Sequence, residues 1–196
     1  MPLIFDEEEK QRIRRQLLTD GREMMLQRGI TGMNLEELAL KAGIAKGTFY
    51  RFFPTKQRFI LEIIRDYQYG KLEQLKKMAA EKQESLTIAE GLAWYQTMMQ
   101  AENPLRLIRE KDLQWILSKI PASEIFDAEL DQAVCRLIFS CMKGIRKDID
   151  YRVVSNFPRI IMFAQMQKEY THQQVLDQNI QMIIETMIHY IREEEP

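Results

Sequence analysis

Residues 46–56 carry closely spaced side chains that can donate hydrogen bonds to a polyanion. Lys46 and Thr48 are followed by Tyr50, Arg51 and Lys56 within a few helical turns. Ammonium, guanidinium and hydroxyl groups are the donors that proteins direct at phosphate oxygens and at the edges of bases. The pattern therefore indicates a nucleic-acid contact, although a short helix of this composition could also arise from packing and solvent exposure alone.

The charge distribution favours the same region. The 196 residues include 28 Lys and Arg and 29 Asp and Glu, a net charge of −1. Residues 10–60 nevertheless hold eleven basic and four acidic residues, whereas residues 1–9 and residues 61–196 are each net −4. A compact basic segment beside a larger acidic remainder indicates a small nucleic-acid-facing unit on a larger body. Phosphate contact or a solvated helix face would each explain three further arginines: Arg12, Arg14 and Arg15.

Residues suited to catalysis or metal binding do not form a recognisable set. His172 and His189 are far apart and have no Cys or HExxH context. Cys135 and Cys141 would face different sides of one helix, so we predict buried free thiols. The sequence also lacks a P-loop, a dinucleotide fingerprint and a GxSxG motif. We therefore expect no enzymatic activity, no metal and no cofactor.

The overall composition is that of a globular protein, with 45% hydrophobic and 29% charged residues. Only 8 Gly and 6 Pro are present, too few for a sandwich of many short strands. Apolar runs do not reach the length of a membrane span, and the first residues lack the basic and apolar regions of a secretory signal. The sequence predicts a cytoplasmic protein that does not bind membranes.

Apolar residues recur with helical spacing along the chain and predict an all-α fold of about nine helices. An amphipathic helix over 7–28 is expected to end at Gly29. Asn34 and Glu37 resemble a capping box at the start of the next helix. Two short helices around Gly43 then lead to a long helix capped by Thr55. The helices expected beyond that point cover 55–82, 87–102, 105–119, 123–147, 151–169 with Pro158 inside, and 173–194 with Thr171 as its cap.

Two short helices joined by a glycine-containing turn and flanked by longer helices are typical of a helix-turn-helix unit. In this motif the second helix enters the major groove and its neighbours contact phosphates. We expect an N-terminal three-helix DNA-binding domain over residues 1–54. Residues 55–196 would then form a second, helical domain.

Residues 31–58, TGMNLEELALKAGIAKGTFYRFFPTKQR, resemble the TetR/AcrR family of transcriptional regulators. The resemblance rests on the order and spacing of Leu38-Ala39, Ala42-Gly43-Ile44, Lys46-Gly47-Thr48-Phe49-Tyr50, Phe53-Pro54 and Lys56. It covers about the first 60 residues, and the remainder agrees only in length and helix count. The resemblance implies a homodimer, usually a repressor, that leaves a palindromic operator on double-stranded DNA when a small, largely apolar effector binds. For residues 55–196 the family resemblance of residues 31–58 implies ligand binding and dimerisation.

The resemblance also implies which residues contact DNA. Gly47 would allow a close approach to the groove, and Lys46 and Thr48 would reach base edges from the first turn of the recognition helix. Phe52 is included by family position alone, because an aromatic hydrocarbon cannot donate to a phosphate. The expected set is Asn34, Lys46, Gly47, Thr48, Tyr50, Arg51, Phe52 and Lys56.

The sequence departs from the family pattern at three positions in this region. Ala45 stands where a capping Ser is common, at a cost of about 1 kcal/mol of local helix stability. Gln57 and Arg58 replace frequent acidic residues, which removes a capping partner for Thr55 and adds positive charge near the DNA.

The last two expected helices carry broad apolar faces, as in a four-helix bundle formed with a second copy. Packing within one chain would explain the same faces. The residues expected at the dimer interface are Phe157, Ile161, Ile180, Ile184, Met187 and Ile188.

The middle helices are rich in Met and aromatic residues, which make adaptable walls for an apolar pocket and also ordinary cores. Arg109 would pair with an anionic group of a ligand, or more simply with Glu110 or Asp112. The residues expected to contact the effector are Trp94, Tyr95, Met98, Met99, Arg109, Trp115, Phe126, Phe139, Met142 and Phe163.

A second function remains open at this point. The chain could be a helical small-molecule carrier or partner-binding protein without sequence-specific DNA binding. Replacing Lys56 by alanine separates the two, since only a DNA binder should lose affinity for all DNA sequences.

Overall fold

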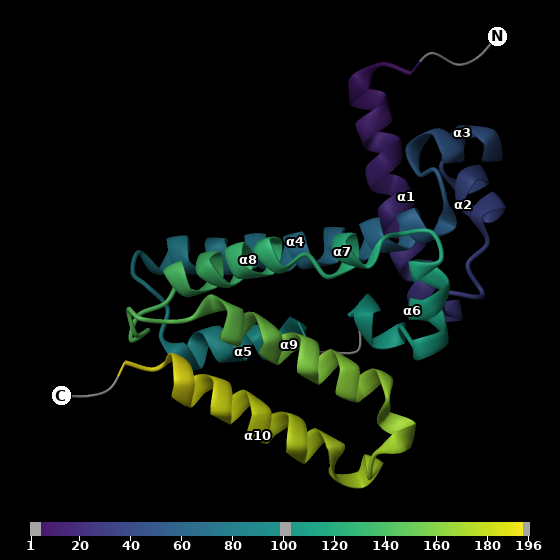
Figure 1. Ribbon diagram of the computed structural model, residues 1–196. Helices are drawn as coiled ribbons and strands as arrows, with labels where there is room; N and C mark the ends of the chain where they lie inside the picture. Colours follow the sequence, from purple (N-terminus) through teal and green to yellow (C-terminus); the bar gives the residue numbers. More distant parts are fainter. Residues whose placement is uncertain (1–4, 99–102, 194–196) are drawn as a thin grey trace.

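The computed structural model of this protein describes residues 5–98 and 103–193, with the side chain of Met98 left out. The described residues are all-α and contain no strand, only two isolated bridges, Leu86 with Met142 and Ile145 with Arg192. The helices, shown in Figure 1, are α1 (Glu7–Arg28), α2 (Leu35–Lys41), α3 (Lys46–Phe52), α4 (Lys56–Lys82), α5 (Ile88–Met98), the 3-10 helix η1 (Pro104–Leu107), α6 (Glu110–Leu117), α7 (Ala122–Ile125), α8 (Ala128–Ser140), α9 (Tyr151–Met166), the 3-10 helix η2 (Lys168–Tyr170) and α10 (Gln173–Ile191).

The first three helices gather around the beginning of α4 at one end of the molecule (Figure 1). The rest of α4 runs away from them and joins α5, α8, α9 and α10 in a bundle of long helices, in which α9 packs against both α8 and α10. The long helix α4 therefore belongs to both ends, because its first turns pack with α1 and its later turns with α5.

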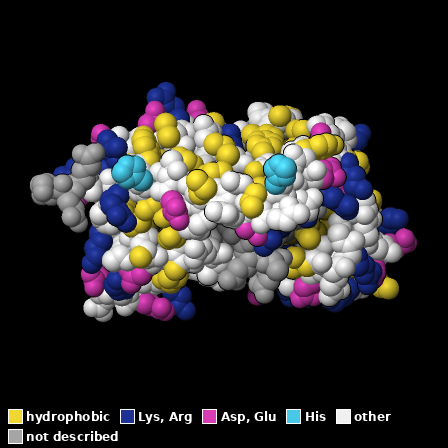
Figure 2. Space-filling model, turned by 90° about the horizontal axis from the view of Figure 1, so that it is seen from below, with side chains coloured by type: hydrophobic (Ala, Val, Ile, Leu, Met, Phe, Trp, Pro, Cys, Tyr) yellow, Lys and Arg dark blue, Asp and Glu magenta, His cyan; other side chains and the backbone are white. Residues whose placement is uncertain are grey.

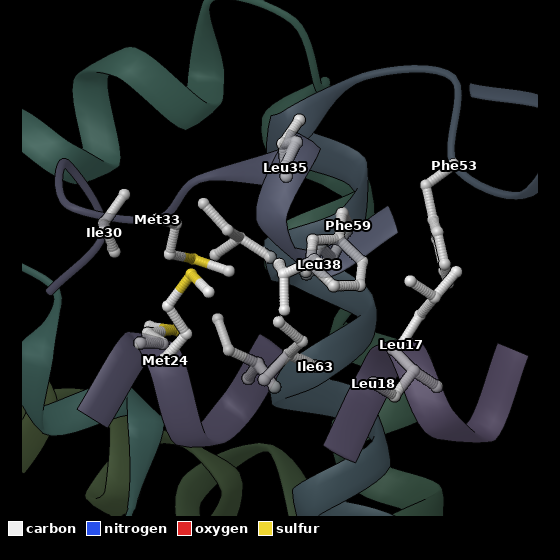
Figure 3. Packing of buried hydrophobic residues seen from close by; sticks show 14 of the residues in the cluster. Leu17, Leu18, Met24, Ile30, Met33, Leu35, Leu38, Phe53, Phe59 and Ile63 are labelled. Atoms are coloured by element: carbon white, nitrogen blue, oxygen red, sulfur yellow. The ribbon is translucent and has the colours of Figure 1, made fainter. Parts of the chain in front are cut away.

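The N-terminal helices are held together by a dense apolar cluster. Figure 3 shows Leu17 of α1, Leu38 of α2 and Phe59 of α4 converging from separate helices. The ring of Phe59 lies 5.0 Å from that of Phe49 and 4.7 Å from that of Phe53. Full burial of these rings makes α3 a fixed part of the domain rather than a loosely attached helix.

This cluster does not stop at the expected domain boundary between residues 54 and 55. It includes Ile63 of α4, Ile116 of α6 and Met166 at the end of α9. The boundary stays a prediction, and the packing shows that the two ends of the molecule share apolar contacts.

Two of the expected long helices are interrupted. The segment 105–119 divides because Asn103 caps η1 through Leu105 N and the chain becomes extended at Ile108 and Arg109 before α6. The segment 123–147 divides at Asp127, whose side chain accepts hydrogen bonds from the first amides of α8.

Helix α8 also ends at Ser140, earlier than expected. Beyond it the backbone pairs with Leu86, whose N–H donates to Cys141 O and whose carbonyl accepts from Lys143 N. This pairing replaces the next helical turn.

The structure confirms some of the helix caps expected from the sequence and contradicts others. Asp6 and Thr55 cap α1 and α4, and Asn34 Oδ1 accepts from the amides of Glu36 and Glu37. Glu37 does not complete the expected capping box, because its carboxylate pairs with Arg28 through two hydrogen bonds of 2.6 and 3.1 Å. The expected cap at Thr171 is wrong, since α10 begins after His172 and the Thr171 hydroxyl donates to Lys168 O.

The start of α5 is fixed by a reciprocal cap between Thr87 and Glu90. Glu90 accepts from the Thr87 amide at 2.7 Å, and the Glu90 amide donates to the Thr87 hydroxyl. The Lys82 ammonium lies 2.7 Å from the same carboxylate, and its hydrogen bond is the main cause that lowers the pKa of Glu90 to about 2.

This lowered pKa predicts a pH-dependent contribution to stability. A carboxylate whose pKa falls on folding stabilises the native state above its unfolded pKa, and loses that effect as the pH falls toward about 2. We expect Glu90→Gln to lower the melting temperature above about pH 5, with the difference from the parent protein shrinking toward pH 2. Thermal unfolding followed by circular dichroism tests this, and Lys82→Gln should show the same convergence. A constant difference down to pH 2 would contradict it.

The described residues contain neither a candidate membrane span nor a candidate metal site. Among residues 5–98 and 103–193, helices long and apolar enough to cross a bilayer do not occur. The same part of the chain contains no cluster of His, Cys, Asp and Glu that could hold a metal ion.

Candidate nucleic-acid interface

The turn between α2 and α3 sets the position of the candidate recognition helix. Gly43 adopts φ +71°, a left-handed conformation that favours glycine, and Ile44 is buried directly after it. Helix α3 then begins at Ala45, which provides no side-chain cap, as expected from the sequence. The two short helices therefore have the arrangement of a helix-turn-helix unit.

One face of α3 is exposed and basic while the other is fixed in the core. Lys46, Gly47, Tyr50 and Arg51 are exposed, whereas Phe49 is fully buried. Four exposed positions spaced in this way share one side of a helix. Three of the predicted donors, Lys46, Tyr50 and Arg51, therefore face away from the protein together.

Gly47 has no role in the packing of its own domain. A Cβ atom added at this position would meet nothing within 4 Å, and the backbone is not in the left-handed region. Glycine inside a helix costs roughly 0.5–1 kcal/mol relative to alanine. The packing of the domain therefore does not require a glycine at this position, and Gly70 of α4 is equally free of contacts.

The charged groups on this face are weakly held. Lys46 Nζ lies 3.4 Å from Glu36 of α2, both side chains being mostly exposed. Arg51 has no hydrogen bond or ion pair within residues 5–98 and 103–193. Exposed ion pairs contribute little to stability, so both groups are available to an anionic partner at small cost.

Other residues of the predicted set have structural duties. Lys56 Nζ donates to Met33 O at 2.9 Å, and partial burial lowers its pKa. The Asn34 side chain is engaged in the cap of α2, and Phe52 is partly buried against the N-terminal cluster. Thr48 is half-buried. A phosphate contact from Lys56 would have to use the remaining ammonium protons, since one is already given to Met33.

Arginines near the interface are mostly engaged elsewhere. Arg58 forms two hydrogen bonds with Glu124 of α7, at 2.5 and 3.3 Å, so the positive charge expected near DNA is paired within the chain. Arg14 lies 2.7 Å from Glu62 and over the ring of Phe53. Arg12 is 3.5 Å from Glu9, and Arg15 is exposed with no partner in the described part of the chain.

An apolar cavity of about 60 Å³ lies in the C-terminal bundle between α5, α8, α9 and α10. Four residues of the predicted effector set line it: Trp94, Tyr95, Phe139 and Met142. The sequence did not single out its other wall residues, such as Gly91, Cys135 and Pro158, because aliphatic and small residues carry no distinctive pattern.

The remaining residues of the predicted effector set lie outside this cavity. Arg109 is exposed, and its guanidinium lies 3.6 Å from the Asp112 carboxylate. This ion pair is the simpler explanation expected for Arg109, in place of contact with an anionic group of a ligand. Trp115 is exposed, and the ring of Phe126 packs 5.8 Å from that of Phe163 on another surface. Met99 and the side chain of Met98 fall outside the described residues.

The predicted dimer residues point largely into their own chain. Ile161, Ile180, Ile184 and Met187 are at most 9% exposed, and Met187 and Ile188 line the cavity. Phe157 packs partly against the cluster around Phe139. These side chains serve the packing within one chain, which is the alternative explanation of the apolar faces, and an interface role for them stays a prediction.

Other apolar side chains of these helices are exposed. They are Val153, Ile160 and Phe163 on α9 and Val175 and Met182 on α10, each 41–56% exposed. Figure 2, which views the molecule from the α10 side, shows hydrophobic side chains gathered on this face around the two histidines.

Comparison with known proteins points to one family. Residues 17–63 match the family described as bacterial regulatory proteins, tetR family. The N-terminal part of this chain belongs to the tetR family. The HTH-type transcriptional repressor NemR of Escherichia coli K12 is 48% identical over 46 residues, which is 24% of this chain and 23% of NemR. The chain thus matches about a quarter of the length of the curated relatives.

Similar folds extend beyond the tetR-family domain. A TetR-family regulator from Pectobacterium atrosepticum covers 97% of this chain and all of its own, with a TM-score of 0.60 and 16% identity. The match with reduced E. coli NemR covers 94% of this chain and 98% of NemR, with a TM-score of 0.56 and 19% identity. The match with FadR from Bacillus subtilis in complex with stearoyl-CoA covers 91% of this chain and 99% of FadR, with a TM-score of 0.52 and 15% identity. At these identities the likeness shows that the C-terminal bundle shares the fold.

Proposed function

We propose that this chain is a ligand-responsive transcriptional regulator, most simply a repressor, that binds DNA through α3. The observation that carries the proposal is the exposed face of α3, where Lys46, Tyr50 and Arg51 surround a glycine that the fold itself does not need. The identity with the repressor NemR falls in the same region of the chain. Lys46 and Thr48 would contact base edges, and Tyr50 and Arg51 would contact phosphates.

The proposal includes a homodimer on a palindromic operator. The exposed apolar residues of α9 and α10, among them Ile160 and Met182, are the surface through which two copies would associate. A two-fold dimer presents two α3 helices, which must lie about 34 Å apart to enter successive major grooves. The operator should therefore be an inverted repeat.

The effector site of the proposal is the apolar cavity in the bundle. A structure of similar fold, FadR, was obtained in complex with stearoyl-CoA, whose long acyl chain supports an effector with a large apolar part. An effector that prefers a conformation with a different spacing of the two α3 helices would weaken operator binding by its differential affinity.

A physical connection between the bundle and α3 is provided by Glu124. Its carboxylate is held by Arg58, and its main-chain carbonyl accepts from Arg65 at 3.0 Å. Arg58 lies in the first turn of α4, just after α3, while Glu124 lies in α7, the element before α8, which lines the cavity. Movement of α8 would therefore be transmitted to the start of α4.

Selection from a pool of randomised duplexes at near-physiological salt, followed by sequencing of the bound fraction, tests the proposal. We expect enrichment of an inverted repeat with half-sites about one helical turn apart. Salt-sensitive binding without enrichment would contradict the proposal and favour the alternative, a helical carrier or partner-binding protein without sequence-specific DNA binding.

A further inference from the structure

We infer that the effector is an uncharged, largely hydrocarbon molecule with one hydrogen-bond acceptor, such as a carbonyl oxygen, which binds to the Tyr95 hydroxyl in the cavity of the C-terminal bundle. The inference rests on the proposed function, because it names the class of molecule to which the regulator would respond. It is carried by the lining of the cavity, by the free hydroxyl of Tyr95 and by the contact between Met142 and Gly91.

Among the described residues, those that line the cavity include none that is charged at neutral pH. The wall consists of aliphatic and aromatic side chains together with Gly91, Cys135 and the hydroxyl-bearing Tyr95. A carboxylate, phosphate or ammonium group placed there would lose its hydration without gaining a counter-ion, which is strongly unfavourable. The cavity therefore excludes charged molecules.

Only a few polar atoms of the wall could orient a ligand. The Trp94 indole N–H is already used, since it donates to Lys71 O at 3.0 Å. The Cys135 thiol is a weak donor, and burial raises its pKa to about 11, so it stays neutral.

Tyr95 is left as the main anchor. Its hydroxyl has no hydrogen-bond partner within the described ranges 5–98 and 103–193. Burial is the main cause that raises its pKa to about 12, with a further contribution from the neighbouring Cys135, so the phenol keeps its proton. The hydroxyl oxygen is not a fully buried atom, so an acceptor atom on the ligand would take the place of water as its hydrogen-bond partner.

Size is controlled by Met142. A cavity of about 60 Å³ is far smaller than a typical ligand pocket of roughly 300–1,000 Å³. The end of the Met142 side chain lies directly over Gly91, where an added Cβ would come within 2.4 Å of its Cε. Methionine has a flexible side chain, so its displacement would enlarge the cavity without disturbing the helices.

Calorimetric titration of the full chain without DNA tests the inference. The probes are three molecules of similar size and shape: acetophenone, which has one carbonyl; isopropylbenzene, which has no polar atom; and benzoate, which is charged. The variants are Tyr95→Phe and Met142→Ala. Tyr69→Phe is the matched control, because Tyr69 is an exposed residue of α4 outside this cavity.

We expect acetophenone to bind more tightly than isopropylbenzene, and benzoate not to bind. Tyr95→Phe should weaken acetophenone about threefold to tenfold, the range of one neutral hydrogen bond, and leave isopropylbenzene unchanged. Met142→Ala should tighten both neutral probes, and Tyr69→Phe should change nothing.

Three results would overturn the inference. The first is that benzoate binds as tightly as acetophenone. The second is that Tyr95→Phe changes the affinity for both neutral probes equally. The third is that neither neutral probe binds to the parent chain or to the Met142→Ala variant. Because these titrations contain no DNA, such a failure leaves the selection result untouched. Failure of the selection would in turn leave a ligand-binding protein with the same pocket.

Discussion

Phe59→Ala is expected to destabilise the N-terminal end of the molecule by about 3–5 kcal/mol. The side chain is fully buried, and its ring contacts those of Phe49 and Phe53 at 5.0 and 4.7 Å. Its removal leaves a cavity between α1, α3 and α4. For a chain of this size the melting temperature should fall by about 6–20 °C, as measured by calorimetry or circular dichroism.

Gly21 supplies a test of the same contact from the opposite direction. A Cβ at Gly21 would lie 2.4 Å from Phe59 Cζ, so Gly21→Ala should destabilise by about 1–3 kcal/mol through overpacking. Combining it with Phe59→Leu should cost less than the sum of the single changes, because the smaller side chain vacates that space. Leu40→Ala, at a position 79% exposed, is the control. Strict additivity would contradict the packing described here.

Charge placed on the exposed face of α9 and α10 should separate the two copies. Ile160 and Met182 are 50% and 56% exposed, and in the proposed dimer both would be covered by the partner. Ile160→Glu with Met182→Glu would bury uncompensated carboxylates at that contact. We expect a monomer in sedimentation experiments, and operator affinity about 100-fold weaker because the two half-sites are no longer bound together.

Met78→Glu is the matched control for this pair. Met78 is an exposed methionine of α4, 39% exposed, and lies outside the face formed by α9 and α10. It should change neither the mass nor the affinity. A double variant that stays dimeric would exclude this face as the interface.

The N-terminal elements could be predicted from the sequence because their signals are local. The bounds of α1 agree with the predicted 7–28, α2 and α3 are the two short helices expected around Gly43, and Thr55 caps α4 as expected. Caps, a glycine at positive φ and one apolar stripe are all properties of a few neighbouring residues. The exposed face of α3 follows from the same periodicity once Phe49 is placed in the core.

Contacts between distant residues could not be predicted in this way. From the sequence, Arg58 is expected to add positive charge near the DNA, whereas in the structure its side chain pairs with Glu124, 66 residues away along the chain. The sequence predicts Ile161 and Ile184 at a dimer interface, whereas the structure buries both within the bundle. Helices α9 and α10 are apolar on more than one side, and periodicity alone does not say which side meets the bundle. Trp115 and Phe163 were expected in a pocket for their residue type, but each lies on the surface.

The central claim, that α3 reads the operator, is tested most directly by repeating the duplex selection with Lys46→Ala. Lys46 is exposed and held only by a 3.4 Å ion pair, so the change should leave folding intact. The claim predicts that the preference relaxes at the same base-pair position in both half-sites, with a loss of about 1–3 kcal/mol on the parent operator. Leu40→Ala should select the parent sequence. If Lys46→Ala also selected the parent sequence with undiminished preference at every position, this role of α3 would be contradicted.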